Sequence, residues 1–240
     1  MPRLDALLAR NLGWSRAAVR EAIEDGRVAI AGAPASDPRR QLAADELPVA
    51  AVVDDTPHTL VDVVRLVLNK PLGCVSALTD ARHPTAYALL RGAPLWSELR
   101  SVGRLDLDTS GLLLWTTDGT EIQRLTHPKR AVPRTYQAAL AGGFRPAPAE
   151  FVLDDGYRPQ ITALADLPRA DAHPSLDVPP DTTALATITI TGGAYHEVRR
   201  IFAALGSHVL GLCRVGYGDV ALPGDLAPGS YRLLDRIVPP

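Results

Sequence analysis

The sequence has only two cysteines among its 240 residues, Cys74 and Cys213, which are too few for a disulfide framework or a cysteine-based zinc site. Its six histidines show no metal-ligand spacing, so we expect no metal ion. No apolar run approaches the roughly 18 residues that a membrane-spanning helix needs. The N-terminus also lacks the basic and apolar segments of a secretory signal. We therefore expect a cytoplasmic protein without a membrane segment.

Lysine is scarce as well, because all but two of the 25 basic residues are arginines, and the net charge is −2. A net negative charge alone speaks against a polyanionic partner, since such partners are bound mainly through Lys and Arg. The charge is unevenly distributed, however. Basic residues outnumber acidic ones from Asp62 to Gln137, and the reverse holds from Ala138 to Ala186. The average charge therefore hides a basic part, which a polyanion can approach, and an acidic part.

The length and the 46% apolar content predict a small domain followed by a larger one. Leucines at helical spacing over 4–12 predict a first helix, and Ser15 is a suitable N-cap for a second helix. A short strand over 28–30 then enters a turn, so 1–47 forms one unit. Residues 48–59 have the Pro and Asp content of a linker. The second domain is expected over 60–240.

One stretch of this second domain combines reactive side chains with a turn. Arg104 and Asp106 stand two residues apart and would share one face of a strand. A Thr-Ser-Gly turn at 109–111 follows, and an apolar run of strand length comes after it. Turn chemistry alone is a sufficient explanation for Thr109 and Gly111. An aspartic protease is disfavoured, because its site needs two carboxylates and the motif occurs once.

The same stretch, Gly-Arg-Leu-Asp-x-x-Thr-Ser-Gly-Leu-Leu-Leu at 103–114, resembles the signature of the RsuA-like pseudouridine synthases of ribosomal RNA. The N-terminal 47 residues resemble an S4 RNA-binding domain, and His-Glu-Val-Arg-Arg at 196–200 is similar to the third motif of the family. In that motif Glu197 replaces the usual Gln. The resemblance implies an α+β protein. A small S4-type α/β domain would precede a larger catalytic domain with a mixed, mostly antiparallel β-sheet flanked by helices.

By this resemblance Asp106 is the catalytic aspartate. Arg199 would pair with its carboxylate and keep it ionised, because a nearby cation opposes the effect of burial. Tyr136 would hold the uracil, since aromatic rings stack on extruded bases. A tyrosine at alternating spacing in a strand is otherwise more often a core residue. Arg104 would fill the space that the flipped base leaves.

Further basic residues are expected to contact RNA. In the S4-like unit they are Arg16, Arg20 and Arg27, although neighbouring acids would also explain them as a solvated helix face. In the second domain they are Lys70, Lys129, Arg130, Arg134 and Arg200. An unplaced basic run such as 124–134 is otherwise commonly a solvated loop.

The function expected from the resemblance is isomerisation of a specific uridine to pseudouridine in ribosomal RNA, most similar to the 16S (small-subunit) enzymes. The alternatives are a paralogue that modifies 23S rRNA and a non-catalytic S4-type protein of ribosome assembly. The expected partner is ribosomal RNA or a pre-ribosomal particle, the expected state is a monomer, and the isomerisation needs no cofactor. Sequence does not separate attack of Asp106 on C1′ from removal of the C2′ proton.

Overall fold

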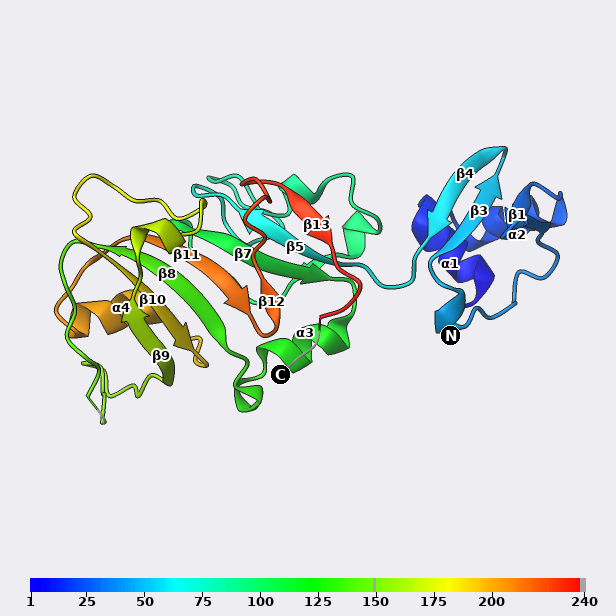
Figure 1. Ribbon diagram of the computed structural model, residues 1–240. Helices are drawn as coiled ribbons and strands as arrows, with labels where there is room; N and C mark the ends of the chain where they lie inside the picture. Colours follow the sequence, from blue (N-terminus) through cyan, green and yellow to red (C-terminus); the bar gives the residue numbers. More distant parts are fainter. Residues whose placement is uncertain (149, 238–240) are drawn as a thin grey trace. The chain divides into compact units, whose positions relative to one another are not determined.

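The computed structural model describes residues 1–148 and 150–237, and the chain forms two compact units (Figure 1). Unit 1 comprises Met1–Val64 and Gly92–Leu99, and unit 2 comprises Arg65–Arg91 and the residues from Arg100 onward. Among the described residues, no helix has the length and apolar character needed to cross a membrane. Each unit has its own apolar core.

Unit 1 packs two helices and a four-stranded antiparallel sheet around one core. The Ser15 hydroxyl accepts a hydrogen bond from the amide of Ala18 at 3.1 Å, which confirms the predicted N-cap. The sheet order is β2-β1-β3-β4. The elements are α1 (Leu4–Leu12), α2 (Arg16–Glu24), β1 (Val28–Ile30), β2 (Ala33–Pro34), η1 (Ala44–Glu46), β3 (Val49–Val53), β4 (Thr56–Leu60) and η3 (Trp96–Glu98).

The stretch expected as a linker, 48–59, is instead the hairpin of β3 and β4, so that prediction is wrong. Asp54 and Asp55 both have positive φ, 48° and 60°, and form its two-residue turn. Asp tolerates this conformation, and such a turn matches the twist of paired strands. Ala51 and Val53 bury their side chains at alternating positions. The polar residues of 48–59 therefore belong to the tight turn and to β4, which is the edge strand of the sheet.

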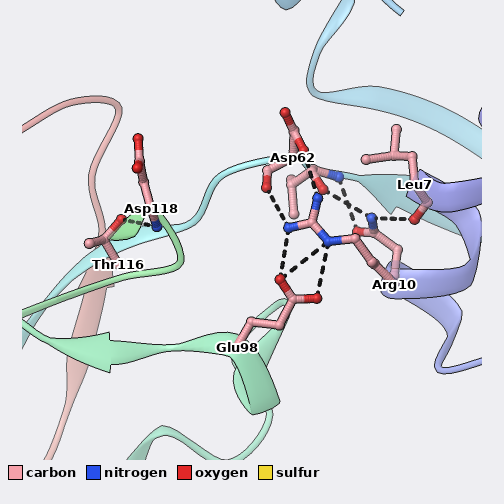
Figure 2. A network of polar contacts seen from close by, with 8 residues as sticks. Leu7, Arg10, Asp62, Glu98, Thr116 and Asp118 are labelled. Carbon is pink, nitrogen blue, oxygen red and sulfur yellow. Dashed lines mark hydrogen bonds and ion pairs between the residues drawn. The ribbon is translucent and has the colours of Figure 1, made fainter. Parts of the chain in front are cut away.

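Unit 1 also holds the segment Gly92–Leu99 through the guanidinium of Arg10 (Figure 2). Its Nη1 donates to Oδ1 of Asp62 at 2.7 Å, while Nη2 and Nε donate to the carboxylate of Glu98 at 2.8 and 3.0 Å. One planar group thus makes a forked contact with one carboxylate and a second contact with the other. This contact explains why residues remote in sequence belong to one unit.

Unit 2 is built on a nine-stranded sheet whose main order is β13-β5-β7-β11-β8-β10-β9. β7 and β11 pair in parallel, and the other strand pairs of the described chain are antiparallel, which confirms the mixed sheet. The strands are β5 (Arg65–Lys70), β6 (Arg100–Ser101), β7 (Thr109–Thr116), β8 (Arg134–Leu140), β9 (Ile161–Asp166), β10 (Ala184–Ile190), β11 (Val209–Tyr217), β12 (Val220–Ala221) and β13 (Tyr231–Leu233). The helices are η2 (Ala88–Leu90), α3 (Gly119–Thr126), η4 (Pro128–Arg130), η5 (Arg169–Asp171) and α4 (Glu197–Ala204).

The central strand β7 is buried along its whole length, as its continuous apolar run predicts. Gly111 lies close to the backbone of β11, because an added Cβ would stand 2.3 Å from the carbonyl oxygen of Arg214. The loop that carries Asp106 leads directly into this strand. Its position is therefore fixed by the most deeply buried part of unit 2.

Candidate active site

Unit 2 contains a cavity of about 950 Å³ at the beginning of β7. Six parts of the chain form its walls, and each contributes at least one polar or aromatic side chain. They are the loop 103–109, the segment 126–132, residues 134 and 136 of β8, the stretch 157–160, the segment 190–199, and residues 212 and 214 of β11, which faces β8. The volume lies at the upper end of the roughly 300–1,000 Å³ typical of ligand sites.

Asp106 opens into this cavity from its loop, with 41% of its side chain exposed. The loop is held from below, because the Ser76 hydroxyl donates to the carbonyl of Leu105 at 2.9 Å and accepts from the Leu105 amide at 3.0 Å. The carbonyl of Asp106 also accepts a hydrogen bond from the amide of Thr109 at 3.2 Å. The carboxylate is thus open to solvent on a loop with a fixed backbone.

Arg199 does not form the expected ion pair with Asp106 among the described residues. Its Nη2 lies 2.9 Å from Oδ2 of Asp108 and donates to the Asp108 carbonyl at 3.0 Å, while Nη1 donates to the carbonyl of Val209 at 3.2 Å. These acceptors engage both terminal nitrogens of the guanidinium. The ring of His196, one helical turn earlier, is the group beside Asp106, with Nε2 3.8 Å from Oδ2. The predicted partner is therefore wrong, and Arg199 holds the loop through Asp108.

Tyr136 lies on β8 in the wall of the cavity, with 8% of the residue exposed. In the register of β8 and β11 it stands beside Arg214, whose side chain is buried and also reaches the cavity wall. The Nε of Arg214 donates to the carbonyl of Leu112 at 2.8 Å, and its Nη2 has no partner among the described residues. A buried unpaired guanidinium nitrogen is costly, so this wall is suited to an acceptor brought by a ligand.

A second group of polar side chains fixes the part of the wall that is formed by Tyr157 and the segment 192–197. The carboxylate of Glu197, 4% exposed, accepts from the Tyr157 hydroxyl at 3.0 Å and from the Ala194 amide at 2.8 Å. Burial and the neighbouring carboxylate raise the pKa of Tyr157 to about 12, so the phenol remains a donor. Arg134 donates to the carbonyl of Gly192 and, at 3.1 Å, to the Tyr217 hydroxyl. Arg134, expected to contact RNA, is instead half-buried and engaged within the fold.

Lys70 is fully buried, so its predicted role as an RNA contact is wrong. It ends β5 beside Gly111, and its ammonium donates to the carbonyls of Thr109 at 2.8 Å and Pro71 at 3.1 Å. Burial lowers its pKa, whereas the thiol of Cys74 and the nearby carboxylates of Asp106 and Asp108 act in the opposite direction. Because β5 continues into the core, Lys70 is buried, and its hydrogen bond to Thr109 holds the end of the loop that carries Asp106.

The other basic residues fall into two groups. Arg104, Lys129 and Arg130 are exposed. Arg104 lines the cavity, and Lys129 and Arg130 lie between two lining residues, Pro128 and Ala131. Arg200, also expected to contact RNA, is instead paired with acidic residues, Asp155 at 2.6 Å and Asp154 at 3.6 Å. Among the basic residues of unit 2 that were expected to contact RNA, the exposed ones therefore lie on the loop of Asp106 and on η4.

In unit 1, Arg20 pairs with the buried carboxylate of Asp5 at 3.0 Å, and Arg27 pairs with Asp54 at 2.9 Å. Arg16 is exposed and has no acidic partner among the described residues. The three arginines expected to contact RNA thus differ, because two of them also stabilise the fold. Their guanidinium groups are partly exposed, 47% for Arg20 and 39% for Arg27, so a phosphate contact is compatible with these ion pairs.

Several cavity residues had no assigned role in the sequence prediction. His196 stands in the recognised motif, but its place beside Asp106 depends on a left-handed backbone, φ 49° and ψ 32°, that is uncommon for histidine. Arg214 sits in an otherwise apolar strand, which was a usable signal because a buried Arg needs partners. Tyr157 and Arg158 lie in an acidic stretch without periodicity. The described residues contain no group of three His, Cys, Asp or Glu side chains arranged to hold a metal ion.

Comparison with known proteins gives consistent results along the chain. Residues 64–204 match the RNA pseudouridylate synthase family, and residues 2–47 match the S4 domain. The ribosomal small subunit pseudouridine synthase A of Haemophilus influenzae is 35% identical over 98% of this chain and 96% of its own length. The protein of the same name from Escherichia coli is 34% identical over 97% of this chain and 96% of its own. A crystal structure of a pseudouridylate synthase, 33% identical, superposes with a TM-score of 0.56 over 98% of this chain and 96% of that one.

Proposed function

Because the chain belongs to the RNA pseudouridylate synthase family, we propose that it converts one uridine of small-subunit (16S) ribosomal RNA to pseudouridine. The observation that carries the proposal is the carboxylate of Asp106, which opens into a cavity of about 950 Å³ from a loop with a fixed backbone. The small-subunit target is supported by the names of relatives that align over nearly the whole chain.

The reaction breaks the bond from N1 of uracil to C1′ of the ribose, turns the base, and joins its C5 to the same C1′. The proton on C5 is released as N1 takes one up, so the product is an isomer of the substrate. Asp106 supplies the carboxylate, either as the nucleophile at C1′ or as the base at C2′, and both routes need it ionised. Tyr136 in the cavity wall offers a ring on which the extruded base can stack.

The remaining side chains have supporting roles in this proposal. Arg104, exposed at the cavity, takes the place of the extruded base in the RNA. Arg199 keeps the loop in position through Asp108. Lys129, Arg130 and Arg16 are exposed cations for the RNA backbone, whose contacts position the substrate without selecting the base.

The partner in this proposal is ribosomal RNA, free or in a pre-ribosomal particle, and the protein acts as a cytoplasmic monomer. The S4-like match over 2–47 supports an RNA partner. The functional division in this proposal follows the two units, because β3 pairs with β1 and the hairpin β3–β4 therefore belongs to the RNA-binding unit.

Pseudouridine mapping of 16S and 23S rRNA from cells with and without the gene tests the proposal. We expect one pseudouridine of 16S rRNA to disappear on deletion and to return with the native gene. Loss of a site in 23S rRNA would assign the chain to the other subunit. An unchanged map in both RNAs would contradict catalysis and favour a non-catalytic assembly protein.

A further inference from the structure

An aromatic pair stands in the wall of the cavity just before α4. The rings of Tyr195 and His196 are stacked, with centroids 3.8 Å apart and an angle of 17° between the planes. Both residues line the cavity, yet Tyr195 is 77% exposed, whereas Tyr136, a cavity tyrosine on strand β8, is 8% exposed. One face of Tyr195 is thus covered by His196, and the ring is otherwise open to solvent.

The backbone holds this pair in place before any ligand binds. His196 has the left-handed conformation, φ 49°, which a non-glycine residue keeps only where its surroundings enforce it. The carboxylate of Glu197 accepts the Ala194 amide at 2.8 Å, and Arg134 donates to the carbonyl of Gly192. Gly192 has no room for a Cβ, because one would stand 2.2 Å from Glu197 Oε1. The turn 192–196 is therefore a preorganised support for the two rings.

The pair also has a defined relation to the reacting group. His196 Nε2 lies 3.8 Å from Oδ2 of Asp106, so the stack extends from the carboxylate outward to solvent. A uridine that enters the cavity toward Asp106 brings its neighbouring nucleotides to this edge. Those neighbours have lost a stacking partner, because the target base has left the strand. Exposed aromatic rings are the usual protein surface for unstacked RNA bases.

From these observations we infer that Tyr195, backed by His196, is a stacking subsite for the nucleobase next to the target uridine. This inference rests on the proposed function, since it assumes that Asp106 acts on an extruded uridine. The charge of the surroundings agrees with an RNA strand, because the exposed side chains of Arg104 and Arg158 line the same cavity. Stacking is tolerant of base identity, so the subsite contributes affinity and placement more than sequence selection.

The test compares Tyr195→Phe, which keeps the ring, with Tyr195→Leu, which keeps apolar bulk without it. Tyr231→Leu, on β13 and outside the cavity lining, is the matched control. Dissociation constants and kcat/KM are measured with unmodified 16S rRNA transcript. We expect Tyr195→Leu to weaken binding by about 5- to 100-fold, the range of one base–aromatic stack, with Phe and the control within about twofold of the native protein. Equal binding by Tyr195→Leu and the native protein would overturn the inference.

A fluorescent probe then locates the base. In the Asp106→Asn background, which allows binding without turnover, 2-aminopurine replaces the nucleotide on either side of the mapped uridine. We expect quenching at one of the two positions, retained with Tyr195→Phe and lost with Tyr195→Leu. Quenching that is equal in both variants would exclude a stack on Tyr195. If the native protein forms no pseudouridine, the proposed function fails, whereas the binding titration with the transcript still decides the stacking.

Discussion

Replacing Gly111 with alanine tests how β7 and β11 place the loop of Asp106. The added Cβ would stand 2.3 Å from the carbonyl oxygen and 2.9 Å from the amide nitrogen of Arg214, and 2.7 Å from Sγ of Cys213. Two of these atoms belong to the backbone of a buried strand, so rotation of a side chain cannot relieve the overlap. The φ of Gly111 is also +101°, which L side chains rarely adopt.

These two effects give the magnitude. Strain at such a φ costs about 1–3 kcal/mol, and overpacking of a close-packed core costs about 1–3 kcal/mol. We therefore expect Gly111→Ala to lower the free energy of unfolding by roughly 2–6 kcal/mol, and the Tm by roughly 5–20 °C for a chain of this size. Turnover should fall as well, because the loop of Asp106 leads into this strand.

Two further Gly→Ala variants separate the causes in urea unfolding followed by circular dichroism. Gly73 has a φ of +76° and open space around its Cα, so its variant should show the backbone strain alone, about 1–2 kcal/mol. Gly119 begins α3, has open space and no positive φ, and its variant should be within about 0.5 kcal/mol of the native protein. If Gly111→Ala is as stable as Gly119→Ala, the close approach of β7 and β11 is refuted.

Three other predictions concern single ion-pair groups. Arg199→Met should lower kcat/KM by about fivefold, and combining it with Asp108→Asn should cost little more, because both remove one partly exposed interaction; additive losses would contradict the pairing. Asp5 is buried, and although burial raises its pKa, hydrogen bonds and charge from Arg3 and Arg20 hold that pKa below its ordinary value. Ionised Asp5 therefore stabilises the fold at pH values above the ordinary pKa of 3.8, and this stabilisation is lost as the pH falls through the lowered pKa. Hydrogen exchange at α1 should accelerate in acid for this reason. The Asp5→Asn variant should exchange faster at pH 7 and lack that acid dependence. Arg10→Ala should destabilise unit 1 by about 1 kcal/mol and speed exchange in 92–99, since both partner carboxylates are partly exposed; unchanged exchange there would exclude the contact.

Individual strands of the larger sheet could be read from the hydrophobic pattern, whereas its mixed pairing was expected only from the family resemblance. The continuous apolar run after Gly111 predicted a buried strand, and β7 is buried at every position. The alternation of β-branched residues over 184–190 is typical of a strand, and this stretch is observed as β10. The hairpin β3–β4 escaped prediction, because Asp54 and Asp55 belong as readily to a loop as to a tight turn.

That Asp106 precedes a buried strand was also readable, because an apolar run of strand length follows it. Two local predictions were wrong: Thr109–Gly111, expected as a turn, begins β7, and Arg104 and Asp106, expected on one face of a strand, lie in a loop. The partners of the charged side chains could not be predicted from the sequence. A helical pattern shows that residues 196 and 199 lie one turn apart, but it does not show how far the helix is shifted along the loop of Asp106. That shift brings His196 to Asp106 and Arg199 to Asp108.

Lys70 shows a second limit of sequence reasoning. A lysine at the end of a strand is usually exposed, and a role in RNA binding follows from its charge. In this fold the strand places Lys70 next to the loop of Asp106, where two backbone carbonyls accept hydrogen bonds from its ammonium group. The Thr109 acceptor is visible only in three dimensions, because 39 residues separate it from Lys70 in the sequence.

The role of Asp106 as the reacting carboxylate is the claim on which the proposed function depends most directly. Asp106→Asn keeps the size of the side chain, and a position that is 41% exposed tolerates the change, so stability should stay within about 0.5 kcal/mol. Asp108→Asn is the matched control, since it makes the same chemical change two residues away.

The decisive measurement is pseudouridine formation by both variants on unmodified 16S rRNA transcript, together with their dissociation constants for it. We expect Asp106→Asn to bind the transcript within about threefold of the native protein and to lose at least about 100-fold in turnover. Asp108→Asn should keep turnover within about tenfold of the native protein. Turnover by Asp106→Asn that equals or exceeds that of Asp108→Asn would contradict the assignment of Asp106.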